Sequence, residues 1–295
     1  MTERLAGAGA GLSPGALPGW NEDDHQAAQA AFLVTSDVAA GPARAFWEQG
    51  FQAVELAGDW MFTGYYEPEL PARSQPDARF RHPVYRLPEG LPQSRPWFSR
   101  AEITAGDMLR GQEIAWLDDP LEAFLLQVQG SGRLVLEDGR VLRLGYGGRN
   151  GHPYVSIGRQ LVLRGEIPLE AMSTEAIRDW ARRNPDRLTA LLNANPSYVF
   201  FRVLNLPPET GPLGAMEQPL TAGRSLAVDP TVVPLGAAVW VMVEEMARLM
   251  VAQDTGSAIK GPRGDIFFGS GVEAGRRAGR LRHSGRAFLL LPREG

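Results

Sequence analysis

The chain of 295 residues contains no cysteine. Disulfide bonds, cysteine zinc sites and thiol nucleophiles are therefore excluded. Histidine is also scarce, because the 4 histidines are widely spaced and form no His-x-x-x-His pair. This pattern disfavours a zinc site, and we expect neither a metal nor a cofactor. No run of about 18 apolar residues is present, so no segment is predicted to span a membrane.

Charge of one sign is not in excess either. The 30 Lys and Arg residues against 34 Asp and Glu residues give a formal net charge of −4. This balance offers no electrostatic basis for binding nucleic acid or an anionic membrane surface. Residues 1–20 are rich in Gly and Ala, but Pro14 and Pro18 interrupt them, and they lack the continuous apolar core of a signal peptide. We expect residues 1–19 to form a flexible arm.

The abundant residues indicate a folded, β-rich protein. Hydrophobic residues make up 44% and charged residues 22% of the chain, as in globular proteins generally. The 34 glycines and 23 prolines predict many turns and few long helices. Leucines that alternate with polar residues around Asp138-Gly139 predict a β-hairpin over residues 134–144. Short apolar runs between Gly and Pro turns favour a mainly β, barrel-like architecture.

Local patterns predict the other elements. Apolar runs predict strands over residues 124–129, 238–243, 248–252 and 286–292. Ala-rich or capped segments predict helices over residues 23–32 and 42–49 and from Ser173 onward, with one or two helical turns over residues 272–278. The Gly-rich residues 145–152 are predicted to form a loop.

Three aspartates in the last third are the main candidates for chemistry. Asp229, Asp254 and Asp265 each lie beside apolar residues in a segment that is otherwise poor in charge. Glycines between Asp254 and Asp265 allow the chain to fold back, so that these two carboxylates could lie side by side. A carboxyl among apolar groups or beside a second carboxylate has a raised pKa and can act as a general acid. The alternative, that each aspartate only caps a turn, stays open.

The string Asp254-Thr255-Gly256 is also typical of aspartic proteases. That chemistry needs two such aspartates that share one proton. The chain contains no second Asp-Ser-Gly or Asp-Thr-Gly string, so an aspartic protease is the least favoured alternative.

Two further patterns suit the binding of sugars. Residues 127–132 combine glycines, which let a ligand approach the backbone, with Gln and Ser side chains that can bond to hydroxyl groups. Tyr65 and Tyr66 could stack on sugar rings. Each pattern also has a structural interpretation, as a hairpin end or as part of the core. His152 has no paired nucleophile in the sequence, which favours a structural role.

Several motifs, in order, resemble known cell-wall enzymes. Residues 227–236, 252–261 and 264–267 resemble the three-aspartate (3D) domain of such enzymes. Residues 63–68, 128–132, 145–154 and 195–201 resemble the membrane-bound lytic murein transglycosylase A (MltA) family. The resemblance covers nearly the whole chain.

The resemblance implies a mainly β fold of two β-barrel domains with a groove between them. Residues 1–77 and 205–295 would form a double-psi β-barrel that carries the 3D domain, and residues 78–204 a smaller inserted barrel. The implied activity is cleavage of the β-1,4 bond between N-acetylmuramic acid and N-acetylglucosamine in peptidoglycan without water. The product would carry a 1,6-anhydromuramic acid end.

The resemblance also implies the site. Asp265 matches the family's catalytic aspartate, and Asp254 and Asp229 match the other two. One carboxyl suffices if it protonates the leaving oxygen and then accepts the proton of the sugar's own C6 hydroxyl, which is already positioned for attack. The residues expected to bind substrate are Tyr65, Tyr66, Gln129, Gly130, Ser131, Tyr146, Asn150, His152 and Lys260.

The implied setting is the periplasm, at the outer membrane, where many family members are anchored through an N-terminal cysteine. Because this chain has no cysteine, we expect membrane attachment only through an anchor that is not present in this chain. The expected partners are peptidoglycan glycan strands and other cell-wall enzymes. A muramidase that uses water and an inactive peptidoglycan-binding protein remain alternatives.

Overall fold

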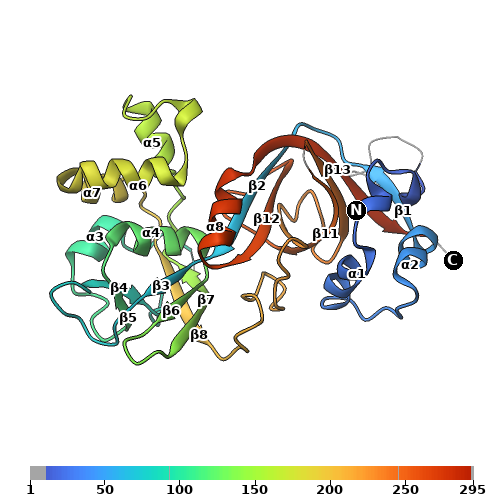
Figure 1. Cartoon of the computed structure of the whole chain (residues 1–295). Coiled ribbons are helices and arrows are strands. Elements are labelled where there is room, and N and C mark those ends of the chain that lie inside the picture. Colours follow the sequence, from blue (N-terminus) through green and yellow to red (C-terminus); the bar gives the residue numbers. More distant parts are fainter. Residues whose placement is uncertain (1–10, 93, 245, 294–295) are drawn as a thin grey trace. The chain divides into compact units, whose positions relative to one another are not determined.

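The computed structural model describes residues 11–92, 94–244 and 246–293. The chain forms two compact units, of which the first comprises residues 1–66 and 208–295 and the second residues 67–207 (Figure 1). Residues 67–77 and 205–207, which the resemblance assigned to the first domain, lie in the second unit. For residues 67–77 the reason is that strand β3 (Glu69–Pro71) pairs with β6 (Gly132–Val135) of that unit.

The first unit is built on a seven-stranded sheet with the order β1-β13-β10-β11-β9-β12-β2. Strand β13 pairs with β2 as well as with β1 and β10, so six of the strands close into a ring. The strands are β1 (Phe51–Glu55), β2 (Trp60–Glu67), β9 (Ser225–Val228), β10 (Ala238–Val243), β11 (Met246–Asp254), β12 (Arg263–Ser270) and β13 (Arg282–Pro292).

Alternation along these strands separates the two faces of the closed sheet. Phe62, Leu226 and Ile266 belong to one buried cluster, which fills the inside of the ring. A second cluster on the outside contains Trp240 and Phe288 and packs against α1 (His25–Leu33) and α2 (Ala43–Gly50). Residues of β2, β9 and β12 that alternate with the inner cluster therefore face outward.

The N-terminal segment is ordered where the structure describes it. Leu12 pairs with Ala53 of β1, Leu17 is buried in the outer cluster, and short 3₁₀ helices cover Pro14–Ala16 and Trp20–Glu22. The expectation of a flexible arm is therefore wrong for residues 11–19, because apolar side chains in this segment contribute to the core. Residues 1–10 lie outside the described residues.

The second unit combines a four-stranded sheet, a two-stranded sheet and five α-helices among its described residues. Its strands are β3, β6, β7 (Val141–Arg149) and β8 (Val199–Leu204) in the larger sheet, with β4 (His82–Tyr85) and β5 (Glu113–Leu117) in the smaller. The helices are α3 (Arg100–Ala105), α4 (Pro120–Gln129), α5 (Ile157–Leu163), α6 (Thr174–Arg183) and α7 (Pro185–Leu192), with a 3₁₀ turn at Leu169–Ala171.

A buried ion pair joins the two ends of this unit. Arg143 of β7 contacts the carboxylate of Glu67, which is 0% exposed, and donates to the backbone carbonyl of Pro207. Arg133 pairs with the second oxygen of Glu67. The segments that enter and leave the unit are thus held to the same strand.

The predicted strand over residues 124–129 is wrong, since these residues form the second half of helix α4. The Asp119 side chain caps the helix, Pro120 occupies its first turn, and Gly130 ends it with a φ of 78°. A short apolar run does not distinguish a buried strand from a buried helix, and the capping residues on both sides decide the matter here.

The Gly-rich residues predicted as a loop are strand through Arg149. Strand β7 continues through them and pairs with β8, with a register shift between Tyr146 and Gly148. A Cβ atom on Gly147 would lie 2.9 Å from the Phe201 backbone. The glycines therefore allow close approach of a neighbouring strand.

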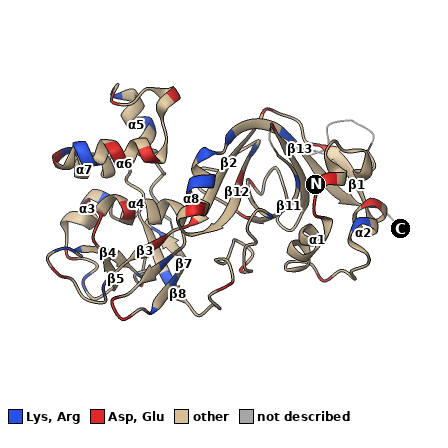
Figure 2. Ribbon diagram, viewed as in Figure 1, with Lys and Arg blue, Asp and Glu red and all other residues tan. Residues whose placement is uncertain are grey.

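The other predicted elements are confirmed. The hairpin forms from β6 and β7, and the segments near residues 23–32, 42–49, 174 and 272–278 are helical, the last as α8 (Gly271–Arg280). The mainly β fold class is confirmed, whereas the double-psi connection, the inserted barrel and the groove stay predictions. In the described part of the chain, no helix is long and apolar enough to cross a membrane. Basic and acidic residues are interspersed along the ribbon of both units (Figure 2).

A buried ion pair in the first unit generates a stability prediction. Arg224 donates to both oxygens of Asp23 at 2.8 and 2.9 Å, and both side chains are less than a tenth exposed. Arg224→Met should reduce the free energy of unfolding by about 3–5 kcal/mol, because the buried Asp23 carboxylate then keeps only the Leu249 N–H and a distant Arg248 as partners.

The control is Arg286→Met, which breaks an exposed pair with Glu55 on the same sheet and should cost less than about 1 kcal/mol. Urea denaturation followed by tryptophan fluorescence measures both. Equal losses in the two variants would contradict the prediction.

Candidate active site

Two of the three aspartates face the same residue from opposite sides. In the sheet register, Asp254 of β11 and Asp265 of β12 are both partners of Ala227 in the intervening strand β9. Neighbouring strands lie about 4.8 Å apart, so the two Cα atoms are about 10 Å apart across β9. Asp265 alternates with the inner residue Ile266 and therefore stands on the outer face of the closed sheet.

A β-bulge brings Asp254 to that outer face. Ala252 belongs to the inner cluster, and simple alternation would point Asp254 inward as well. The register shifts between Ala252 and Asp254, so Gln253 is an extra residue in β11. The Gln253 side chain is 1% exposed, accepts from the Ser225 hydroxyl at 2.6 Å and donates to the Ala31 carbonyl at 2.8 Å. These bonds hold the bulge in place.

Strand β2 supplies a hydroxyl group to each carboxylate. The Thr63 hydroxyl donates to Asp265 Oδ1, and the Tyr65 hydroxyl donates to Asp254 Oδ2, both at 2.7 Å. Thr63 and Tyr65 are two residues apart, so they share the outer face of β2. The Tyr65 ring packs against Phe267 of β12 at a centroid distance of 5.4 Å.

Burial of Asp265 raises the pKa of its carboxyl to about 6. The hydrogen bond from Thr63 and the positive charge of Arg263 oppose this rise, and the nearby Asp254 carboxylate adds to it. Among the described residues, no hydrogen bond reaches Asp265 Oδ2. A carboxyl with this pKa and one oxygen without a bond can give and take a proton near neutral pH.

Asp254 is held as an acceptor on both oxygens. Besides the bond from Tyr65, Oδ1 accepts from the backbone N–H groups of Ala215 and Thr255 at 3.0 and 2.9 Å. Burial raises the pKa of Asp254, and these three donated bonds oppose the rise. The bonds leave Asp254 suited to act through its charge and position rather than to transfer protons.

Asp229 differs from the other two aspartates. Its buried carboxylate accepts from the N–H of Gly261 at 2.9 Å and from the hydroxyl and N–H groups of Thr231. These hydrogen bonds, that of Gly261 first, lower its pKa, so the expectation of a raised pKa is wrong at this position. Asp229 ties the turn after β9 to the loop that joins Asp254 to Asp265.

Two other predicted residues of the first unit lie apart from the two carboxylates. Tyr66 follows Tyr65 in β2 and so points to the opposite face, where its ring packs against Gly275 of α8; a Cβ atom on that glycine would lie 2.9 Å from the ring. Lys260 is exposed in the loop beside Gly261, where its charge contributes to the low pKa of Asp229.

In the second unit, Asn150 and His152 both contact backbone groups of the protein itself. Asn150 is 2% exposed, donates through its amide to the carbonyls of Phe98 and Pro196, and accepts from the N–H of Tyr198, all at 2.8 Å. The expectation that the Asn150 amide holds a substrate group therefore does not fit its burial. His152 Nε2 lies 2.8 Å from the Trp97 carbonyl oxygen.

The remaining predicted residues of this unit form two groups. Gln129, Gly130 and Ser131 lie where α4 ends, with the Gly130 N–H bonded to the Leu126 carbonyl and Ser131 buried. Tyr146 of β7 is 50% exposed, which leaves its ring accessible to a ligand.

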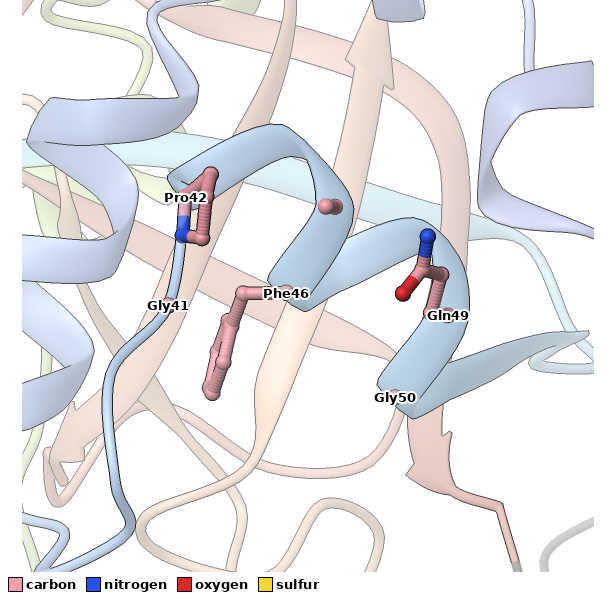
Figure 3. A pocket seen from close by; sticks show the side chains of 6 residues that line it. Gly41, Pro42, Phe46, Gln49 and Gly50 are labelled. Atoms are coloured by element: carbon pink, nitrogen blue, oxygen red, sulfur yellow. The ribbon is translucent and has the colours of Figure 1, made fainter.

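A shallow pocket elsewhere on the first unit is distinct from this site. It is lined by Gly41, Pro42, Ala45, Phe46, Gln49 and Gly50 on and before α2 (Figure 3). None of these residues can donate or accept a proton at neutral pH, which gives the pocket no catalytic group.

Sequence reasoning did not identify Thr63, Gln253 or Arg263 as site residues. Thr63 could have been found, because it stands two residues before Tyr65, and this spacing places two side chains on the same face of a strand. Arg263 has the same spacing of two residues from Asp265, whereas Gln253 carries no such signal, since a bulge appears only in the fold.

Comparisons with known proteins agree with the geometry. Residues 61–202 match the family described as the MltA specific insert domain, and residues 224–291 match the 3D domain, which contains all three aspartates. The membrane-bound lytic murein transglycosylase A of Escherichia coli strain K12 is 37% identical over 270 residues, or 85% of this chain and 72% of the relative. The chain belongs to the MltA family.

Solved structures of the family share the fold. A membrane-bound lytic murein transglycosylase from Agrobacterium tumefaciens is 33% identical with a TM-score of 0.87, over 96% of this chain and 97% of that one. The E. coli MltA with bound chitohexaose is 36% identical with a TM-score of 0.76, over 86% and 79% of the two chains.

The bond from Tyr65 to Asp254 generates a second prediction. Tyr65→Phe removes a hydrogen bond that favours the ionised carboxylate, so the pKa of Asp254 should rise. Carbon NMR titration of the aspartate carboxyls measures this pKa. Tyr66→Phe, on the opposite face of the same strand, is the control and should leave it unchanged. The same Asp254 pKa in Tyr65→Phe as in the parent chain would disprove the contact.

Proposed function

We propose that this MltA-family chain is a lytic transglycosylase that cleaves the β-1,4 bond between N-acetylmuramic acid and N-acetylglucosamine in peptidoglycan. We propose Asp265 as its acid and base. The observation that carries this role is that the outward-facing Asp265 carboxyl has a pKa of about 6 and is held by Thr63 through one oxygen only. The family membership supports the reaction class.

In the proposed first step, protonated Asp265 gives its proton to the glycosidic oxygen as the bond to C1 breaks. The transition state resembles an oxocarbenium ion, and the negative charges of Asp254 and of the newly ionised Asp265 would stabilise it. In the second step, the C6 hydroxyl attacks C1 and its proton passes to Asp265. Asp265 is then protonated again, and the muramic acid residue is left with a 1,6-anhydro bridge.

The hydrogen bonds of Asp254 favour this route over hydrolysis. A hydrolase needs a second carboxylate that either activates water or attacks the sugar. Asp254 accepts three hydrogen bonds on its two oxygens. Burial raises the pKa of Asp254, but these bonds oppose the rise and occupy both oxygens, so Asp254 is better suited to stabilise positive charge than to remove a proton from water.

Asp229 is proposed as a positioning residue. It accepts a hydrogen bond from Gly261 in the loop between Asp254 and Asp265. This bond would fix the position of the loop just before β12, the strand that carries Asp265. For contact with substrate we propose Tyr65 near the carboxylates, the exposed Tyr146 ring, and the polar groups of Gln129, Gly130 and Ser131.

The setting follows from the substrate. The relatives are named membrane-bound and murein transglycosylases, and we propose that this chain acts in the bacterial cell envelope on glycan strands. A position in the periplasm at the outer membrane, and binding to other cell-wall enzymes, are proposals that rest on the family resemblance alone.

The assignment of Asp265 predicts a loss of turnover. Asp265→Asn cannot supply or take up a proton and should abolish release of muropeptides from purified murein while binding of glycan strands persists. Because the acid must be protonated, the rate of the unsubstituted chain should fall as the pH rises through about 6.

The comparison variant is Asp254→Asn, which should lose on the order of 10²-fold in rate, as for removal of one stabilising group. Circular dichroism checks that both variants fold. If both lost activity equally and completely, a mechanism with two carboxylates would replace this one.

The product distinguishes the proposed reaction from its alternatives. Intramolecular attack by the C6 hydroxyl gives an anhydro end that is one water lighter than a hydrolytic fragment. Mass spectrometry of the released muropeptides should find this product, and a chelator should leave the rate unchanged. Reducing-end muramic acid as the main product would make the chain a muramidase, and binding without any product would make it an inactive glycan-binding protein.

A further inference from the structure

Arg263 is a half-buried cation close to Asp265 that has no role in the steps proposed above. It lies two residues before Asp265 in β12, on the same outer face. Its Nη2 donates to the Thr63 hydroxyl oxygen over a long 3.4 Å, and Thr63 donates in turn to Asp265 Oδ1 at 2.7 Å. The three side chains therefore form a relay from β12 to β2 and back to β12.

The direction of this relay follows from the chemistry of its members. A guanidinium group has only donors, so Arg263 can contact the Thr63 oxygen only by giving it a hydrogen bond. Thr63 carries a single hydroxyl proton, and the short contact with Asp265 directs that proton to Oδ1. Oδ1 is then an acceptor, and a proton on the Asp265 carboxyl must occupy Oδ2. Oδ2 is the oxygen that no hydrogen bond reaches among the described residues.

Stability does not account for the position of Arg263. Its Nη1 is anchored to the Ala258 carbonyl at 3.1 Å, whereas its Nε is buried and has no hydrogen-bond partner in the part of the chain that the structure describes. A buried donor without a partner reduces the stability of a fold. Such a group in a native structure calls for a role other than stability.

We infer that Arg263 is a positioning residue for the reaction: through Thr63 it orients the Asp265 carboxyl so that Oδ2 carries the proton given to the substrate. This inference rests on the proposed role of Asp265. It adds a residue that does not itself touch the reacting atoms. The charged and titratable groups around Asp265 are Arg263 on its own strand, Tyr65 on β2 and Asp254 on β11.

Arg263→Met tests the inference with purified murein as substrate. Loss of the relay should reduce kcat by about tenfold, the rate equivalent of one hydrogen bond of ordinary net strength. Loss of the positive charge should move the falling limb of the pH profile of kcat/KM upward by about one pH unit, because Asp265 then stays protonated to higher pH. The Tm should change little, since removal of the unpaired buried Nε donor offsets loss of the exposed bond to the Ala258 carbonyl.

Two further variants test whether Arg263 acts through its charge and through Thr63. Arg263→Lys keeps the positive charge and a donor group. It should therefore keep the falling limb of the kcat/KM profile at the parent pH and retain most of kcat. In a Thr63→Val background, where the relay is already broken, Arg263→Met should reduce kcat much less than in the parent chain. If Arg263→Met does not fold, Arg263→Gln replaces it as the test, because glutamine keeps an amide donor but lacks the charge. Arg263→Gln should retain kcat and still move the falling limb of the kcat/KM profile to higher pH.

The matched control is Arg276→Met on α8, where Arg276 is exposed and pairs only loosely with Glu273 at 3.3 Å. This variant should change neither kcat nor the pH at which kcat/KM falls. An unchanged kcat in Arg263→Met, or an equal loss of kcat in the parent and Thr63→Val backgrounds, would overturn the relay. Failure of the proposed function is recognised separately, because turnover by Asp265→Asn would refute the role of Asp265 whatever the Arg263 variants do.

Discussion

The side of the closed sheet on which Asp254 stands depends on one extra residue, Gln253. Without this bulge, Asp254 would follow Ala252 into the apolar interior of the ring, where an ionised carboxyl is strongly disfavoured. The bulge is secured by a buried amide that bonds to Ser225 of β9 and to Ala31 of α1. Helix α1, the N-terminal part of the first unit and the candidate site are therefore linked through a single side chain.

Asp254 and Asp265 then lie on either side of strand β9 and differ in the hydrogen bonds that they accept. Asp254 accepts three bonds, whereas Asp265 accepts one from Thr63, and this asymmetry gives each group its proposed role. Burial raises the pKa of both carboxyls, but only the carboxyl with a free oxygen can exchange its proton with a substrate. Pairs of acids whose environments differ in this way are typical of catalytic sites.

Other polar residues that the sequence predicted for the site hold the backbone of their own unit. The ionised carboxylate of Asp229 accepts hydrogen bonds that connect two loops. The Asn150 side chain bonds to three backbone segments of the second unit. The predicted motifs therefore contain residues that hold the backbone as well as residues that are available to a ligand. Exposure and the number of bonds already made distinguish them, since a fully bonded, buried amide has no group left for a ligand.

The sequence alone was sufficient for the family, the fold class and Asp265 as the leading candidate, because strings such as residues 252–261 and 264–267 are long and specific. It also predicted the hairpin at Asp138-Gly139, where two neighbouring residues determine the turn. It misassigned residues 124–129, since the helix there depends on caps at Asp119 and Gly130. Only the tertiary structure decided that Asp254 faces outward, that Thr63 bonds to Asp265 and Arg263 to Thr63, and that Asn150 is buried. Each of these depends on contacts between residues far apart in the chain, and no local pattern of residues encodes such contacts.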